Sequence, residues 1–68
     1  MFKFSIVDLG GNKKNITCLV RELRQNNLIA GTEMDLSGDP VYLTQNIVAV
    51  KKIFEDYDGL MLDLHKEK

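Results

Sequence analysis

The stretch LGGNKKNITCLVRELR, residues 9–24, decides the fold of this 68-residue chain. Two glycines end a strand-like run, and Asn12 and Asn15 can each cap the helix that follows. Apolar residues then recur at positions i, i+3, i+4 and i+7, which is the pattern of an amphipathic helix. They are Ile16, Leu19, Val20 and Leu23. We predict a helix from about Lys13 to Asn26, ended by an asparagine pair because Asn tolerates the left-handed conformation.

A second stripe, polar and mostly basic, lies opposite the apolar one on the predicted helix. Lys13, Thr17, Arg21 and Arg24 are spaced by four, four and three residues, so their side chains line up along the helix. This stripe is a candidate surface for binding an acidic protein partner. The alternative interpretation is an ordinary solvated helix face.

Length and charge limit the classes of protein that the chain can belong to. A chain of 68 residues forms one domain, residues 1–68, with one small core. The net charge of −1 gives no overall field that would hold a nucleic acid or an anionic membrane, so we expect neither as a partner. The sequence shows no signal peptide and no run of about eighteen apolar residues, which indicates a soluble, cytoplasmic protein.

The residue types typical of catalysis and metal binding are sparse. The single cysteine, Cys18, lies at the edge of the apolar stripe and is predicted to be partly exposed, and the single histidine, His65, lies near the end of the sequence. No Ser-His-Asp set, no catalytic carboxylate pair and no metal-ligand spacing can be assigned. We therefore expect a protein that is not an enzyme and that binds no metal and no cofactor.

The rest of the chain contains three strand-like segments and a second helix. Residues 2–8, 41–44 and 60–65 alternate between two sets of side chains, as half-buried strands do. The helix is predicted after residue 46, with Thr44 or Asn46 as its cap and with Gly59 as its end. Its apolar face consists of Ile47, Val50, Ile53, Phe54 and Tyr57.

The connector, residues 28–37, permits two interpretations. Thr32 and Asp35 have the spacing of a capping box, which favours a short helix. Residues 32, 34 and 36 also alternate with acidic residues, which is a strand pattern. If the connector is a helix, the fold is a β-α-α-β-α-β, two-layer α+β sandwich with a three-stranded antiparallel sheet. If the connector is a strand, the sheet has four strands and the fold is ferredoxin-like, βαββαβ.

Two long segments, FKFSIVDLGGNKKNITCLVREL and the run from Asp39-Pro40-Val41 through VAVKKIFEDYDGLMLDL, resemble one known family. They are similar to the C-terminal domain of the bacterial ribosomal stalk protein. That domain begins with a Phe-led strand, Gly-x-Asn-Lys and a helix ending in Val-Arg-Glu, and it closes with a Lys-rich helix, a Gly and a strand. The resemblance implies the three-stranded fold, with a short helix over residues 32–37.

In the stalk family, the basic face of the first helix binds translational GTPases. The resemblance therefore implies a protein-binding role for Lys13 and Arg21, whereas Cys18 stands where the family usually has Lys. We expect a small protein-binding module with an acidic, translation-related partner, present as a monomer or a weak homodimer. The alternative is a ferredoxin-like regulatory module that binds a small ligand at the Gly10-Gly11 turn, as a dimer.

Overall fold

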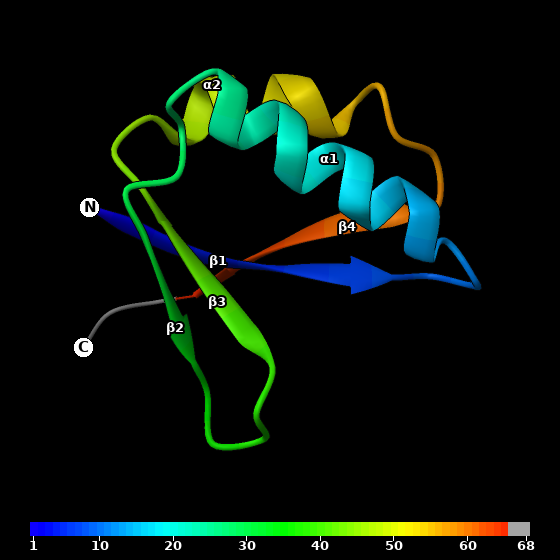
Figure 1. Ribbon diagram of the computed structural model, residues 1–68, viewed down its shortest axis with the longest axis horizontal. Helices are drawn as coiled ribbons and strands as arrows, with labels where there is room; N and C mark the ends of the chain where they lie inside the picture. The colour runs from blue at the N-terminus through cyan, green and yellow to red at the C-terminus, as the bar shows by residue number, and fades with distance from the viewer. Residues whose placement is uncertain (66–68) are drawn as a thin grey trace.

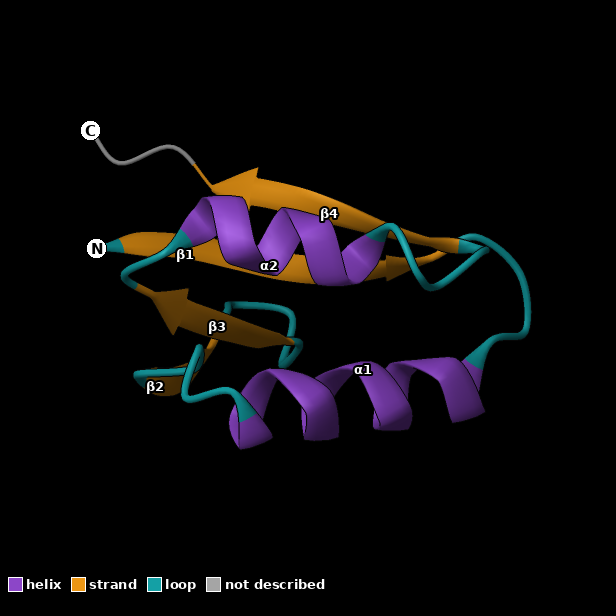
Figure 2. Cartoon of the chain, turned by 90° about the horizontal axis from the view of Figure 1, so that it is seen from above, coloured by secondary structure: helices purple, strands orange, loops and turns teal. Residues whose placement is uncertain are grey.

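The computed structural model describes residues 1–65, which form a four-stranded sheet and two helices. The elements are β1 (Phe2–Asp8), α1 (Lys13–Gln25), β2 (Gly31–Met34), β3 (Pro40–Thr44), α2 (Ile47–Phe54) and β4 (Leu60–His65). The strand order is β2-β3-β1-β4, and all neighbours are antiparallel. Both helices lie on the same side of the sheet (Figure 1). Seen from above, α2 lies along β1 and β4, whereas α1 lies on the side of β3 (Figure 2).

The predicted α+β class is confirmed, but the three-stranded arrangement is wrong because residues 31–44 form a β-hairpin. Asp35 closes its turn. The main-chain N–H of Asp35 donates to the carbonyl oxygen of Asp39 (2.9 Å), and Asp35 Oδ1 accepts from the N–H groups of Ser37 and Asp39 (2.8 and 2.9 Å). Gly38 has a φ of 85°, which glycine adopts without steric cost. The four-stranded order is compatible with the ferredoxin-like alternative.

The core lies between the helices and the sheet, around Phe4 of the central strand. The Phe4 ring is fully buried and lies edge-on to Phe54 of α2, with ring centroids 6.1 Å apart. Leu19 and Leu23 of α1 and Val50 of α2 are also fully buried. The remaining apolar residues of both predicted helix faces are partly buried against this cluster, so the predicted faces are confirmed. They are Ile16, Val20, Ile47, Ile53 and Tyr57.

The helix ends agree with the predicted capping residues, with two differences. Asn27 follows α1 with a φ of 56°, and Asn46 Oδ1 accepts a main-chain hydrogen bond from the first turn of α2 (3.1 Å). Asn12 stands at the start of α1, but its side chain donates to the carbonyl oxygen of Gly59 (3.2 Å) instead of capping the helix. α2 ends at Phe54, earlier than predicted. Within residues 1–65, neither helix is long and apolar enough to cross a membrane.

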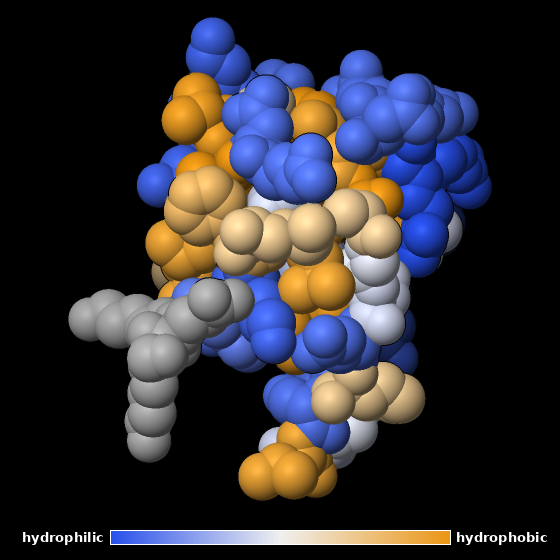
Figure 3. Space-filling model, turned by 90° about the vertical axis from the view of Figure 1, so that its left-hand side faces the viewer, coloured by the Kyte–Doolittle hydropathy of each residue, from blue (hydrophilic) through white to orange (hydrophobic). Residues whose placement is uncertain are grey.

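The second face of the sheet is not covered by either helix. It mixes apolar and polar side chains from β1, β3 and β4, in cross-strand pairs such as Val7 with Met61 and Ser5 with Asp63. In Figure 1 the turn of the β2–β3 hairpin projects below the body of the molecule, and this turn carries the fully exposed side chain of Leu36. Figure 3 shows hydrophobic surface at this lower tip.

Candidate protein-binding site

The polar stripe predicted on the first helix lies on the exposed side of α1. All four of its members are exposed: Lys13, Thr17, Arg21 and Arg24. Thr17, Arg21 and Arg24 line one shallow groove, to which Val20 also contributes. Lys13 lies at the other end of the helix and lines a separate depression. The structure therefore brings three of the four predicted residues together.

The groove on α1 carries positive charge that the described part of the chain leaves unpaired. Within residues 1–65, neither Arg21 nor Arg24 forms an ion pair, and the pair that is found joins β1 to β2. Glu22, the acidic residue of α1, accepts a hydrogen bond from the Tyr57 hydroxyl group (2.8 Å). The Thr17 hydroxyl group donates to the main chain of its own helix (3.2 Å). Both guanidinium groups therefore have donors free for a carboxylate.

The Gly10-Gly11 turn, the alternative candidate for a ligand site, holds a carboxylate of the chain itself. Asp8 Oδ1 accepts from the main-chain N–H of Gly10 (2.9 Å), and both carboxylate oxygens accept from the N–H of Asn12 (3.1 and 3.0 Å). The hydrogen bond from Gly10 is the largest cause that lowers the pKa of Asp8 below its ordinary value. Two of the main-chain donors of this turn are therefore already bonded to Asp8.

Tyr57, which follows α2, makes a hydrogen bond to α1 that should appear in the pH dependence of stability. Its hydroxyl group donates to Glu22 Oε1 at 2.8 Å, and chiefly for this reason the pKa of Tyr57 is raised to about 12. A raised pKa means that the protonated tyrosine favours the folded state. This contribution is complete below pH 10.0, the ordinary pKa, and is lost as the pH rises through about 12.

We expect Tyr57→Phe to be less stable than the wild type at neutral pH, since the variant lacks this hydrogen bond. The difference in free energy of unfolding between the two proteins should shrink as the pH rises from 10.0 to about 12. Urea titrations across that range measure both effects. Equal stability of the two proteins at neutral pH would contradict the assignment.

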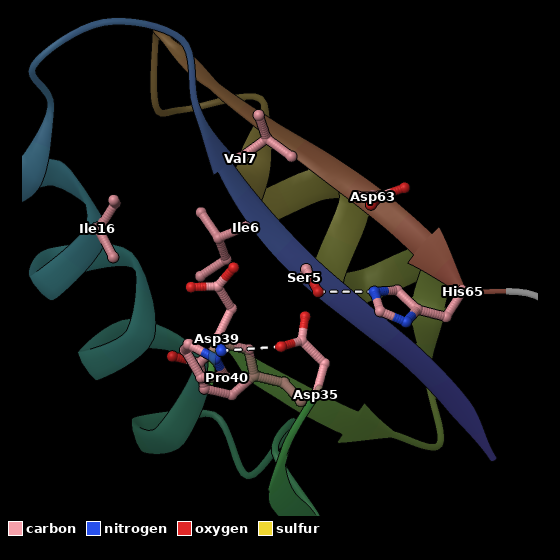
Figure 4. Close-up of a pocket in the computed structure, with 10 residues that line it drawn as sticks. Ser5, Ile6, Val7, Ile16, Asp35, Asp39, Pro40, Asp63 and His65 are labelled. Carbon is pink, nitrogen blue, oxygen red and sulfur yellow. Dashed lines mark hydrogen bonds between the residues drawn. The ribbon is translucent and has the colours of Figure 1, made fainter. Parts of the chain in front are cut away.

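The sheet brings together a serine and a histidine that the sequence could not pair. Ser5 Oγ lies 2.6 Å from His65 Nε2, and Asp63 is the register partner of Ser5 on β4 (Figure 4). In the sequence, the only signal for this contact is that Ser5 and His65 both occupy polar positions in segments that alternate between apolar and polar residues. Among residues 1–65, no group of three or more His, Cys, Asp or Glu side chains is placed to hold a metal ion. Cys18, predicted to be partly exposed, is exposed on α1.

Comparisons of the chain with protein-family models, with curated proteins and with solved structures found no match. They neither support nor oppose the resemblance to the ribosomal stalk domain. The fold does differ from what that resemblance implied, because a hairpin replaces the short helix over residues 32–37.

Proposed function

We propose that this chain is a small, non-enzymatic protein-binding module that uses the basic face of α1 to bind an acidic protein partner. The observation that carries the proposal is the exposed groove lined by Thr17, Arg21 and Arg24, in which the two arginines form no ion pair within the described residues. Because the net charge of the chain is −1, this attraction is local and does not extend to polyanions in general.

The groove favours a partner that offers carboxylates beside an apolar side chain. Arg21 and Arg24 are three positions apart, so their side chains are neighbours about 5 to 6 Å apart at Cβ. Val20 gives the groove an apolar component, which an alkyl or aromatic group of the partner would cover. The resemblance to the stalk domain suggests an acidic surface of a translation factor as the first partner to test. Binding should weaken with added salt, because the charges are exposed.

Charge reversal of the groove tests this proposal. We expect R21E/R24E to weaken binding of the partner about tenfold or more, since both attractive contacts become repulsive. The matched control is K51E/K52E, which makes the same change of charge at two exposed lysines in the last turn of α2. Affinity capture from the native cell with quantitative mass spectrometry identifies the partner, and titration with the purified partner gives the dissociation constants.

The proposal requires R21E/R24E and K51E/K52E to differ in how strongly they bind the partner. A partner retained by K51E/K52E and lost by R21E/R24E supports binding at α1, provided that the circular dichroism spectra of the two variants match the wild type. Equal retention of every captured protein by the wild type and R21E/R24E would rule out the groove as the binding surface.

A further inference from the structure

A cleft of about 440 Å³ lies between β1 and the turn of the β2–β3 hairpin, away from the groove on α1. Its apolar lining includes Ile6 of β1 and Ile16 of α1, and the hairpin contributes Asp35, Asp39 and Pro40. Figure 4 shows both carboxylates extending from the hairpin toward β1. The volume falls in the range of about 300 to 1,000 Å³ that is usual for ligand sites.

The cleft exists because β1 and β3 stop pairing partway along β1. The last register pair is Phe4 with Tyr42, whereas β1 continues to Asp8. Two residues beyond the last pair, the ladder would need an N–H from Pro40 opposite Ile6, and proline has none. The hairpin therefore separates from β1 at Pro40.

The main-chain groups of Ile6, which lines the cleft, and of Asp8 point to the β3 side of β1. Residues of an antiparallel strand turn their N–H and C=O groups alternately to the two neighbouring strands. The carbonyl oxygen of Leu43 accepts from Ala30 on the β2 side, so Tyr42 turns toward β1 and Phe4 toward β3. Ile6 and Asp8 follow Phe4 by two and four positions and share its direction. Within residues 1–65, the register gives neither of them a partner strand on that side.

The charge at the cleft selects a cationic organic ligand. Asp35 and Asp39 are exposed, and within the described residues the Asp39 carboxylate accepts no hydrogen bond. The described residues hold no cluster suited to a metal ion, whereas the apolar lining suits an alkyl chain. A lysine or arginine side chain combines an alkyl stem with a charged end. The α1 end of β1 is less suitable for a cation, because Lys13 lies close enough to affect the pKa of Asp8.

We propose that this cleft binds an extended, basic peptide segment of a partner protein, which adds to β1 as a strand. Its main chain pairs with the free edge of β1 at Ile6 and Asp8, and a lysine or arginine lies between the carboxylates of Asp35 and Asp39. Strand addition of this kind gives affinity through main-chain hydrogen bonds and specificity through alternate side chains. The cleft is separate from the groove on α1, so this proposal is tested independently of the function proposed above.

Three capped pentapeptides test the inference: Val-Lys-Val-Lys-Val, its Glu-for-Lys version, and the Lys version with N-methyl groups on alternate residues. Only the unmethylated Lys peptide is expected to bind. Binding should slow amide hydrogen exchange at Ile6 and Asp8 and leave Ser5 and Val7 unchanged, since those two already face β4. Nuclear magnetic resonance reads each amide separately.

The protein variant D35N/D39N should bind the Lys peptide about tenfold more weakly, because two exposed charge contacts are lost. Asparagine can still close the hairpin turn, so the fold should be kept. The matched control is D56N/D58N, which removes two exposed carboxylates between α2 and β4. Equal binding of the methylated peptide would exclude strand addition, and equal binding by D35N/D39N would exclude the charge contact. No detectable binding of the Lys peptide up to about 1 mM would overturn the proposal.

Discussion

The variant Phe4→Ala is expected to lose most of its folded stability. Phe4 is fully buried in the central strand, 5.6 Å from the ring of Tyr42 and 6.1 Å from that of Phe54, so truncation leaves a cavity between the two layers. Removing a buried Phe side chain costs about 3 to 5 kcal/mol. A domain of this length has a total of only about 3 to 10 kcal/mol.

The matched control for Phe4→Ala is Phe2→Ala in the same strand. Phe2 is 43% exposed, so its truncation removes less buried apolar area and should cost much less. Urea unfolding followed by circular dichroism gives the free energy of unfolding of both variants. If the two substitutions cost the same, the placement of the core around Phe4 would be incorrect.

The variant Gly59→Ala is expected to be the second most damaging, by about 2 to 4 kcal/mol. Gly59 has a φ of 80°, which is unfavourable for every residue with a Cβ atom. The added Cβ would also lie 2.9 Å from Asn12 Cγ, closer than real Cβ atoms approach another carbon. That collision would displace the Asn12 amide group from the carbonyl oxygens of Gly59 and Gly10 (3.2 and 3.1 Å).

Two other glycines separate the causes of this loss. Gly11→Ala has the same kind of backbone strain, at a φ of 66°, but its Cβ would meet no atom within 4 Å. Gly10→Ala carries neither penalty. Thermal and urea unfolding should rank Gly59→Ala below Gly11→Ala, with Gly10→Ala near the wild type. The Asn12→Ala substitution should also cost less in the Gly59→Ala background than in the wild type, because the collision is then absent.

The helices could be predicted from the sequence because their signals are local. The apolar stripe of α1 and the asparagine at its end lie within about four turns of one another, and Leu19 and Leu23 are buried as their spacing predicts. The exposure of Thr17, Arg21 and Arg24 follows from the same spacing. Whether that surface binds a partner stays a prediction.

The short helix predicted for the connector was wrong, because the interactions that decide its conformation cannot be recognised from a local sequence pattern. Asp35 fits a capping box and also fits a hairpin turn, and the choice depends on β2 finding Tyr42 and Val41 on β3 as register partners. Both the cleft and the contact between Ser5 and His65 depend on strand register between distant segments. Alternation predicts which residues share a face but not which residues lie opposite them.

The pairing of β1 with β4 sets the order in which this protein can be assembled in the cell. β1 is synthesised first and occupies an interior position of the sheet, but its neighbour on one side, residues 60–65, is synthesised after both helices. A growing polypeptide therefore exposes an unsatisfied main-chain edge at Ser5 and Val7, which face β4, until the ribosome has released that late segment. The sheet therefore closes only after β4 has left the ribosome, and until then the nascent chain is open to capture by chaperones.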